Sequence, residues 1–370
     1  MFVSHLEGVL VNTLKFFCFL ILIFIGGCGS NGTNDDSSVP EIKSTLTETL
    51  DNYLDTTIPS SGAGIAIFVN KNDTVKYTGI KGLANKHENI LIDADTGFRI
   101  ASISKVFTAL AIMKLYEQEL IQLNDSILMY LPELPSSWQH ITIHHLLSHQ
   151  SGIAQYENHP DATIWADGQT NDDVLNFYIS HPELTFEAGS KGEYSNAGYH
   201  LLAEIIFKAV GIRYEDYMDE YFFEPLSMNN SYVTDETTSP RVNDALNFAQ
   251  YTTFKGKNNF TNGANGIVSS INDLNIFISA LLDGQIVQLE TLELMLEHHT
   301  PALLGGADYG YGWILAPEGS DAFSHTGGHD GFRTWLLINR DKNLRMMILG
   351  NGGDLTGDHE QLANLMGPFL

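Results

Sequence analysis

The chain has 370 residues, of which 43% are hydrophobic and 17% are charged, and its formal net charge is −26. This length and composition allow one large folded domain or two small ones, and they exclude a disordered chain. The acidic balance argues against a nucleic-acid partner, because phosphate contacts require a surface of Lys and Arg. We ascribe the charge to solubility.

The N-terminal segment has the pattern of an export signal. An apolar run from Phe16 to Ile25 follows Lys15 and is too short for an ordinary membrane span. The following "IGGC", which ends at Cys28, resembles a bacterial lipobox, in which the cysteine is lipidated and becomes the mature N-terminus. We therefore expect a lipoprotein-type signal peptide over 1–28 and a membrane-anchored lipoprotein that faces the periplasm or the cell exterior. An uncleaved anchor and a plain signal peptide, which would give a secreted protein, are the alternatives.

The remainder divides into a tether and one folded domain. Residues 29–44 contain "GSNGTNDDSSVP", a composition typical of a flexible linker. Residues 45–370 contain no internal repeat and no linker, so we expect a single domain there. Because Cys18 lies in the apolar run and Cys28 is the only other cysteine, a disulfide framework and a cysteine nucleophile are excluded from the folded domain.

Helices and strands follow one another in blocks along this domain. A helix is predicted over 41–55, then a hairpin with strands over 64–70 and 75–82, and then a long apolar helix from Ser102. Further helices are predicted over 141–153, 172–180, 197–211 and 269–284. Strands are predicted over 311–317, 322–328, 331–340 and 344–351, with a closing helix over 358–370. Strands at both ends and helices between them predict one sheet built from both termini, with a helical region beside it.

The predicted helix from Ser102 is apolar on nearly every side, yet it contains Lys105, whose charged form is costly to bury. Lys105 stands three residues after Ser102, so the two side chains share a face of the helix. A serine hydroxyl needs a base to become a nucleophile, and burial destabilises the charged form of a lysine enough for it to be that base. We therefore interpret the pair as nucleophile and base. The structural alternative is a capping serine and a lysine that reaches solvent.

Two further motifs carry polar groups suited to the same chemistry. Tyr194 and Asn196 lie in a polar loop before a helix, where a phenol can relay a proton and an amide can hold a substrate amide. A second Tyr-x-Asn begins at Tyr156, but we favour the first because a helix follows it. Near the C-terminus, "HTGG" starts at His325, and its glycines allow close approach to the strand backbone. Backbone N–H groups of Ser102 and of this strand can form an oxyanion hole.

Other histidines raise the question of a metal site. His145 and His149 are four residues apart on a predicted helix, but no Glu stands beside them as in a zinc-protease motif. His298 and His299 lie at a helix end, where cations suit the helix dipole. We therefore expect no metal site, and helix-end or core roles for these histidines.

Together these motifs resemble those of the serine β-lactamase-related family, which includes class C β-lactamases, D-alanyl-D-alanine carboxypeptidases of peptidase family S12 and related esterases. The pattern is Ser-x-x-Lys, then Tyr-x-Asn, then Lys or His followed by Thr-Gly. The stretches that carry the resemblance are "FRIASISKVFTALAIMKL", "ITIHHLLSHQSGI", "YSNAGYHLLAEII", "NGIVSSINDLNIFISALL" and "HTGGHDGF", within about residues 45–350. The implied fold is α/β (α+β) and β-lactamase/transpeptidase-like: an antiparallel sheet flanked by helices, with the site between it and an all-helical lobe.

The resemblance also implies a role for each motif residue. Ser102 would be the acylated nucleophile, Lys105 its base or proton relay, and Tyr194 the proton carrier to the leaving group and for the hydrolytic water. Asn196 would hold the substrate amide. The substrate would lie along the strand formed by His325, Thr326 and Gly327. Gly328 would supply the second oxyanion N–H, and no metal or organic cofactor would be needed.

One departure from the β-lactamase pattern bears on the substrate. Class C β-lactamases typically have lysine where this chain has His325, and histidine is mostly neutral at neutral pH. Arg333 is a candidate cation for a substrate carboxylate, although a solvated surface arginine is the plainer interpretation. We therefore expect a D-Ala-D-Ala carboxypeptidase-like or D-amino-acid peptide hydrolase that works through an acyl-enzyme on a small-molecule or peptide substrate. The alternatives are an esterase or weak β-lactamase, and a non-catalytic penicillin-binding sensor or scaffold.

Overall fold

The structure is a computed structural model that describes residues 45–159, 168–235, 238, 240–248, 261–329, 331–353 and 359–369. Its main feature is an eight-stranded antiparallel sheet in the order β2-β1-β13-β12-β11-β10-β9-β8. The strands are β1 (Ile65–Lys71), β2 (Thr74–Lys81), β8 (Thr300–Leu304), β9 (Ala307–Tyr309), β10 (Ile314–Leu315), β11 (Ala322–His329), β12 (Phe332–Asn339) and β13 (Leu344–Gly350). Two small sheets accompany it, formed by β3 (Leu83–Asn85) with β4 (Ile90–Leu91), and by β5 (Phe98–Arg99), β7 (Ile267–Ser269) and β6 (Tyr232–Val233).

Strands from the N-terminal and C-terminal parts of the described chain lie side by side in the large sheet, where β1 is the second strand and β13 the third. β1 pairs with β13 over its whole length, from Ile65 opposite Gly350 to Lys71 opposite Leu344. The β1–β2 and β12–β13 hairpins form as the sequence predicts. The expectation of one sheet built from both termini is therefore confirmed.

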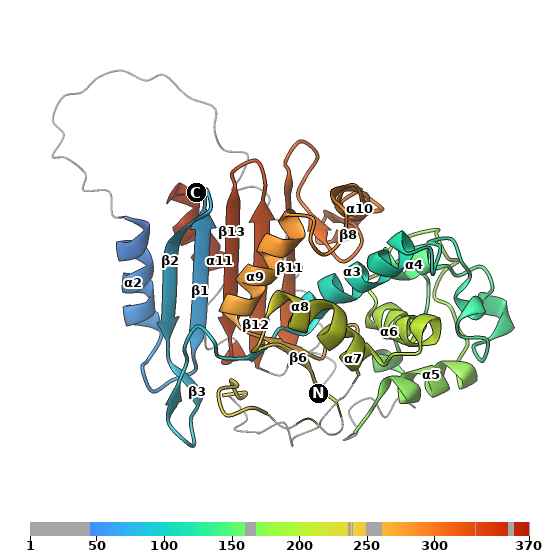
Figure 1. Cartoon of the computed structure of the whole chain (residues 1–370), viewed down its shortest axis with the longest axis horizontal. Coiled ribbons are helices and arrows are strands. Elements are labelled where there is room, and N and C mark those ends of the chain that lie inside the picture. Colours follow the sequence, from blue (N-terminus) through green and yellow to red (C-terminus); the bar gives the residue numbers. More distant parts are fainter. Residues whose placement is uncertain are drawn as a thin grey trace.

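Helices cover both faces of the sheet (Figure 1). α2 (Leu46–Thr57) and α11 (His359–Met366) pack on one face, where Leu50 and Leu362 join a core cluster with Trp335. On the other face α9 (Ile271–Leu282) packs against β1 and β13. Successive side chains of β1 point to opposite faces of the sheet and so contribute to a core on each face. Ile67 joins the cluster under α2 and α11, and Phe68 joins the core cluster on the other face.

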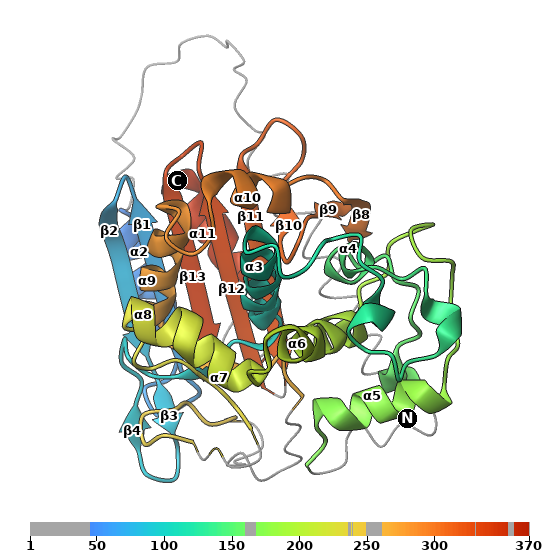
Figure 2. The same cartoon turned by 45° about the vertical axis from the view of Figure 1, so that its right-hand side comes forward.

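A helical lobe lies to one side of the sheet, and both views show it (Figures 1 and 2). It contains α4 (Ile143–Leu147), α5 (Asn171–Ser180) and α6 (Asn196–Val210), and α3 (Ser104–Glu117) runs between it and the sheet. The other helical segments are η1 (Ala101–Ile103), η2 (Ile127–Met129), η3 (Ser136–Trp138), η4 (Tyr156–Asn158), α7 (Tyr214–Met218), η5 (Asp219–Phe223), α8 (Glu224–Leu226), α10 (Leu289–Met295) and η7 (Gly367–Phe369).

The main departure from the predicted elements lies at the nucleophile. The sequence pattern predicts that the long helix begins at Ser102, but Ser102 lies in the 3₁₀ turn η1 and the helix begins at Ser104. The reason is the backbone of Ala101. Its φ of 51° is left-handed, so a right-handed helix cannot extend through this residue toward the N-terminus. The small sheet of β5, β7 and β6 was also not predicted from the sequence.

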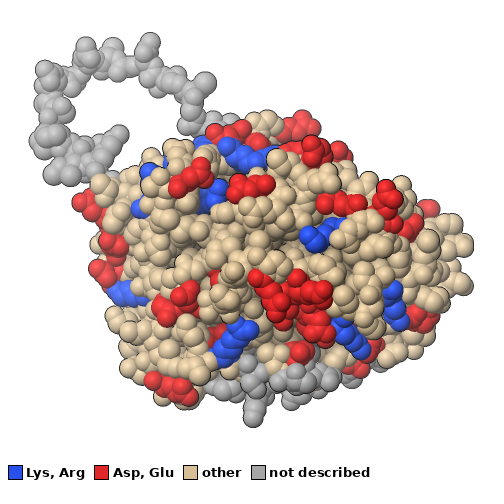
Figure 3. All heavy atoms as spheres, viewed as in Figure 1, with Lys and Arg blue, Asp and Glu red and all other residues tan. Residues whose placement is uncertain are grey.

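The predicted signal peptide over 1–28 and the tether over 29–44 lie outside the described residues. In the part of the chain that is described, no helix combines the length and the apolar character needed to cross a membrane. The acidic character predicted from composition is visible on the surface, where Asp and Glu side chains gather over α7 and α8 (Figure 3). These include Glu215, Asp216, Asp219, Glu220 and Glu224.

Candidate active site

Ser102, the candidate nucleophile, lies on a short turn that is anchored to neighbouring strands by hydrogen bonds. Ile100 donates its backbone N–H to the Ile267 carbonyl at 3.0 Å, and its own carbonyl accepts from Thr334 Oγ1 at 2.9 Å. Between these anchors and Ser102, Ala101 adopts its left-handed φ of 51°. Strained backbone of this kind persists only where the surroundings enforce it, and it is concentrated at functional sites. The turn leaves Ser102 only half-buried at the N-terminal end of α3.

Lys105, the predicted base, is fully buried in α3, with 0% of its surface exposed. Its Nζ donates to Asn196 Oδ1 at 2.7 Å, to the Ala264 carbonyl at 3.0 Å and to Ser102 Oγ at 3.3 Å. An ammonium group has three donors, so the charged form of Lys105 is satisfied by hydrogen bonds. Burial nevertheless lowers the pKa of Lys105 to about 7, while the negative charge of Glu157 raises it. Lys105 is therefore poised to exchange a proton with Ser102 near neutral pH.

The tyrosine candidate lies over this lysine. Lys105 Nζ is 4.8 Å from the centroid of the Tyr194 ring. Burial raises the pKa of Tyr194, while a hydrogen bond with Ser102 lowers it. Because the phenol keeps its proton at neutral pH, Tyr194 can donate or relay a proton, and Lys105 is the group that can accept one. Ser195 fixes this loop, because its Oγ caps α6 by accepting from the Gly198 N–H at 3.2 Å.

Asn196 lies in the centre of the site, but its contacts are within the protein. Its Oδ1 accepts from Lys105, and its Nδ2 donates to Glu157 Oε1 at 3.1 Å. The amide is therefore held between a lysine and a carboxylate. The expected contact of Asn196 with a substrate amide stays a prediction, and only the donor and acceptor capacity left over from these two bonds is available for it.

The histidine of the "HTGG" motif is buried and serves as a neutral strand residue. His325 is 1% exposed; its Nδ1 donates to the Thr326 carbonyl at 2.7 Å, so Nε2 is the acceptor for the Tyr309 hydroxyl at 3.0 Å. Burial, with the charge of Lys105, lowers the pKa of His325 to about 3. His325 therefore presents no positive charge to a substrate at neutral pH.

The strand that carries this motif has an edge available for a substrate. β10 pairs with β11 only at Phe323 and Ser324. Among the described strands, none pairs with the outer edge of β11 beyond Ser324, whereas the inner edge pairs with β12 as far as His329. An extended substrate can add to such an edge through backbone hydrogen bonds. The half-buried Thr326 lies in this section of the strand.

The two glycines of the motif have different surroundings. A Cβ at Gly327 would collide with the Ile100 carbonyl oxygen and the Thr334 hydroxyl. Gly327 is therefore needed for the nucleophile turn to pack on β11, which is a different reason from the expected approach of a ligand. Gly328 is exposed, and a Cβ there would meet only the Arg333 side chain, at 3.4 Å.

Arg333 is the candidate cation for a substrate carboxylate, and the structure places it next to the motif. It lies opposite Gly328 in the β11–β12 pairing, is half-buried, and donates from Nη1 to the Phe332 carbonyl at 2.9 Å. Arg333 is thus close to the end of the substrate edge, and its role in carboxylate binding stays a prediction.

An aromatic cluster that no sequence motif predicts lies beneath the site. The ring of His149 is 4.4 Å from Tyr194, 5.0 Å from Tyr199 and 4.6 Å from Tyr309, measured between centroids. Its Nδ1 accepts from the Ser195 backbone N–H at 3.1 Å. His149 therefore supports the loop that carries the tyrosine candidate, and it takes this position because its φ of 60° turns the chain after α4.

The other histidines considered for a metal have different partners. His145 Nδ1 accepts from the Thr142 backbone N–H at 3.2 Å as part of the α4 cap, and His298 Nδ1 lies 2.6 Å from Asp308 Oδ2. His299 stacks on Tyr311 with centroids 3.9 Å apart. Among the described residues, no group of three or more His, Cys, Asp or Glu is arranged to hold a metal ion.

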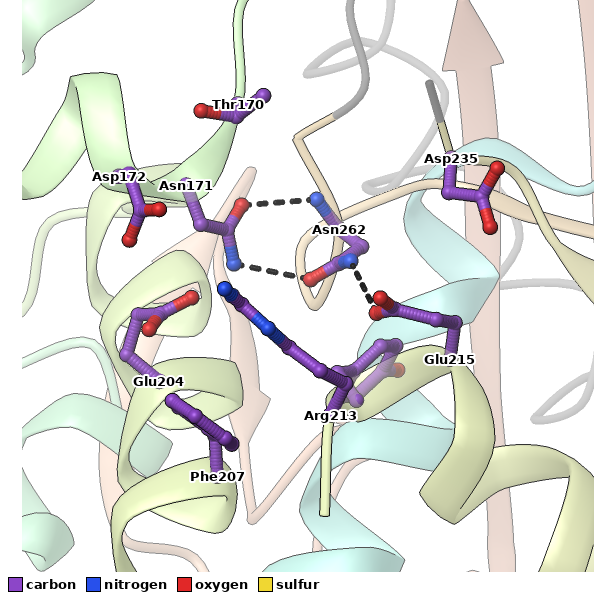
Figure 4. A pocket seen from close by; sticks show the side chains of 10 residues that line it. Thr170, Asn171, Asp172, Glu204, Phe207, Arg213, Glu215, Asp235 and Asn262 are labelled. Atoms are coloured by element: carbon purple, nitrogen blue, oxygen red, sulfur yellow. Dashed lines mark hydrogen bonds between the residues drawn. The ribbon is translucent and has the colours of Figure 1, made fainter. Parts of the chain in front are cut away.

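A separate cavity of about 280 Å³ lies close to the site, and Ser102, Lys105 and Tyr194 are not among its lining residues (Figure 4). It is lined by Thr170, Asn171, Asp172, Glu204, Phe207, Arg213, Tyr214, Glu215, Asp235 and Asn262. Asn262 donates its backbone N–H to Asn171 Oδ1 at 2.9 Å, and two residues later the Ala264 carbonyl accepts from Lys105. The cavity therefore adjoins the segment 262–264, whose Ala264 carbonyl accepts a hydrogen bond from Lys105.

A serine, a buried lysine and a tyrosine in contact, between an antiparallel sheet and a helical lobe, define the class of serine hydrolases with a β-lactamase/transpeptidase-like fold. The sequence profile of the family described as Beta-lactamase matches residues 54–367, and the chain belongs to this family. The predicted resemblance and fold class are therefore confirmed.

Curated relatives and solved structures agree with this assignment. The chain is 29% identical to Penicillin-binding protein 4* of Bacillus subtilis (strain 168), over 76% of this chain and 66% of that protein. It is 26% identical to Protein flp of Staphylococcus aureus (strain MW2), over 78% of this chain and 59% of that protein. The chain thus spans about three-fifths to two-thirds of the length of these relatives.

Two solved structures illustrate the shared fold. An octameric penicillin-binding protein homologue from Pyrococcus abyssi superposes with a TM-score of 0.73 at 25% identity, over 87% of this chain and 76% of that chain. The D-amino acid amidase from Ochrobactrum anthropi SV3, complexed with L-phenylalanine amide, gives a TM-score of 0.72 at 24% identity, over 88% and 97%.

Proposed function

We propose that this serine hydrolase works through an acyl-enzyme on amide or ester bonds, with D-amino acid amides and peptides as its preferred substrates. The observation that carries the proposal is the buried Lys105, whose pKa is lowered to about 7 and whose Nζ lies 3.3 Å from Ser102 Oγ. A base with a pKa near the working pH is the most effective activator of a serine hydroxyl.

The proposed steps follow from this contact. Ser102 Oγ attacks the carbonyl carbon while its proton passes to Lys105. Tyr194 relays the proton to the leaving nitrogen, so the C–N bond breaks and an amine departs. A water molecule then attacks the acyl-enzyme, its proton returns by the same groups, and the acid and free Ser102 are released. The backbone N–H groups of Ser102 and Gly328 are proposed to bind the oxyanion.

The ranking of substrates depends on His325. Because burial lowers its pKa to about 3, it offers no cation for the carboxylate of a β-lactam or of a peptide C-terminus. Arg333, beside Gly328, is the remaining candidate for that role. Amides that lack a carboxylate are therefore favoured over β-lactams and over peptides with a free C-terminus. The printed names of the relatives fit either preference, since they include penicillin-binding proteins and a D-amino acid amidase.

The test is a substrate panel for residues 45–370. We expect hydrolysis of D-phenylalanine amide to be faster than that of L-phenylalanine amide, of an N-acylated D-Ala-D-Ala peptide or of a chromogenic cephalosporin. Rapid turnover of the cephalosporin would make the chain a β-lactamase, and turnover of short acyl nitrophenyl esters alone would make it an esterase. Slow, persistent labelling by penicillin without turnover would instead support a sensor.

We also propose that residues 1–28 direct export and that Cys28 carries the lipid anchor. The proposal depends on the sequence of this segment. Fractionation of cells that express the full chain and a Cys28→Ala variant tests it: only the chain with Cys28 should be recovered in the membrane fraction. Equal recovery of both forms there would point to an uncleaved anchor, and recovery of both in the soluble exported fraction to a plain signal peptide.

A further inference from the structure

The cavity of about 280 Å³ beside the catalytic centre has no part in the proposed mechanism. It lies between the start of α5, the middle of α6, the start of α7 and the segment that precedes β7 (Figure 4). Its volume is close to the lower end of the range for small-molecule sites, about 300 Å³. The space therefore suits a single small molecule, such as an amino acid.

The charged groups around this cavity are mostly acidic. Four carboxylates and one guanidinium line it, namely Asp172, Glu204, Glu215, Asp235 and Arg213. The lining therefore has a net negative charge, which attracts a ligand of net positive charge. The surroundings of Glu204 and of Arg213 narrow the choice of ligand.

Glu204 is the most buried of these carboxylates, with 6% of its surface exposed. Within the described residues, no hydrogen bond joins its carboxylate to the other side chains that line the cavity (Figure 4). Burial and the charge of Asp172 raise the pKa of Glu204, while Arg213 and the Asn171 amide lower it. Asn171 Nδ2, however, already donates to Asn262 Oδ1 at 2.9 Å and to a backbone carbonyl at 3.4 Å. A nearly buried carboxylate without a donor of its own is costly, and a positively charged donor stabilises it most.

Arg213 is the cation among the lining residues. It is the N-cap residue of α7, and its Cζ lies 4.6 Å from the centroid of the Phe207 ring. Figure 4 shows its guanidinium group extending toward Asn171 and Glu204, and no hydrogen bond joins it to a lining carboxylate of the described chain. A guanidinium group binds a carboxylate through two parallel hydrogen bonds. Arg213 and Glu204 together therefore offer a place for a carboxylate beside a place for an ammonium, the two groups that an α-amino acid carries on one carbon.

Two further carboxylates line the cavity on the side opposite Glu204 (Figure 4). Glu215 is half-buried, and its Oε2 accepts from Asn262 Nδ2 at 3.4 Å. Asp235 lies on the same side. Because no second cation among the lining residues balances these groups, they favour a ligand whose other end is positively charged.

We propose that this cavity binds a free basic amino acid, whose α-ammonium group donates to Glu204, whose α-carboxylate accepts from Arg213 and whose side-chain ammonium lies near Glu215. A neutral amino acid would leave the excess negative charge of the lining unbalanced, and a plain diamine would leave Arg213 without an anion. The binding requires no reaction at Ser102 and does not depend on the proposed function.

Isothermal titration of the mature chain, residues 29–370, tests the proposal with three related probes. Lysine has all three charged groups, norleucine lacks the side-chain ammonium, and cadaverine lacks the α-carboxylate. We expect the preferred enantiomer of lysine to bind about ten- to a hundredfold more tightly than either analogue, since a hydrogen bond to a charged group is of that magnitude. Equal binding of cadaverine and lysine would overturn the assignment of an amino acid, and no measurable binding of lysine would overturn the site.

Variants of two lining residues locate the binding. Arg213→Gln should weaken lysine binding about ten- to a hundredfold, yet it should leave cadaverine bound at least as tightly as before, because the guanidinium repels a diamine. Glu204→Gln keeps the shape of the side chain and should weaken both ligands. Glu220→Gln is the control, because Glu220 is an exposed carboxylate of the neighbouring η5 that does not line the cavity, and it should change either affinity by less than about threefold.

Two results with the variants would contradict the proposal. If Arg213→Gln binds lysine as tightly as wild type, the carboxylate contact is wrong. If Glu220→Gln weakens lysine as much as Glu204→Gln does, the acidic surface attracts lysine without a defined site. Thermal unfolding checks that each variant is folded, and if Glu204→Gln is not, the opposite responses of lysine and cadaverine to the change at the exposed Arg213 decide.

Discussion

Lys105 combines complete burial with hydrogen bonds to Ser102, Asn196 and Ala264. Burial disfavours the charged form and the Glu157 carboxylate favours it, and the balance lowers the lysine pKa to about 7. Burial therefore brings the pKa of the amine close to neutral pH, where it can act as a base. A lysine on the surface would stay protonated at neutral pH and could not accept the Ser102 proton.

The pH dependence of acylation follows from this pKa. Only the neutral amine accepts a proton, and it is populated above the pKa, so the rate of labelling by a fluorophosphonate should rise about tenfold per pH unit below 7 and level off above it. Intact mass after short reaction times between pH 5 and 10 measures this. A rise centred near pH 10, the range of an unperturbed lysine, would contradict the role of Lys105.

The site residues differ in how far the sequence could predict them. Ser102 and Lys105 are three residues apart, so local helical geometry alone predicts their contact. The Glu157–Asn196 hydrogen bond spans 39 residues, and its formation depends on how η4 packs against the start of α6. No local pattern signals that packing. The only available sign was the second Tyr-x-Asn, at Tyr156, whose central residue is Glu157.

At the scale of elements, β11 brings the nucleophile and the substrate edge together. The turn η1 packs directly against it, and the space for this contact exists because residue 327 has no side chain. A single glycine on the strand therefore sets the position of Ser102 relative to the oxyanion N–H proposed for Gly328.

The two adjacent glycines provide a matched test of this arrangement. Gly327→Ala should lower the free energy of unfolding by about 1–3 kcal/mol and reduce labelling of Ser102 strongly, because the new methyl group displaces the turn. Gly328→Ala meets only a flexible arginine side chain and should change stability by less than about 0.5 kcal/mol. Urea unfolding and labelling rates check both variants. Equal effects at the two positions would show that the turn does not depend on the packing at Gly327.

Most elements could be predicted because their signals are local. The helix predicted over 197–211 forms as α6, which Ser195 caps and Gly211 closes at a φ of 74°. The start of α3 could not be predicted, since the left-handed φ of Ala101 is enforced by distant partners on β7 and β12. Short strands such as β5 and β6 exist only through their pairing with β7, which no periodicity reveals.

At the scale of the whole molecule, both ends of the domain are needed to build one sheet. Asn351, fully buried after β13, accepts from the Gly64 N–H at 2.7 Å and donates to the Leu83 and Leu246 carbonyls at 3.0 and 2.9 Å. One side chain thus joins the N-terminal hairpin, the C-terminal strand and a middle segment. The sequence predicts the sheet from the two sets of strands, but it does not identify this junction.

The proposed mechanism requires an activated Ser102, and covalent labelling of this residue tests that requirement. Residues 45–370 are incubated at pH 8 with a fluorophosphonate, and intact mass is recorded for wild type, Ser102→Ala and Lys105→Ala. We predict one adduct on wild type, none on Ser102→Ala, and labelling at least about a hundredfold slower on Lys105→Ala. A wild-type chain that stays unmodified, or a Ser102→Ala chain that is labelled equally fast, would contradict the assignment of Ser102 as the nucleophile.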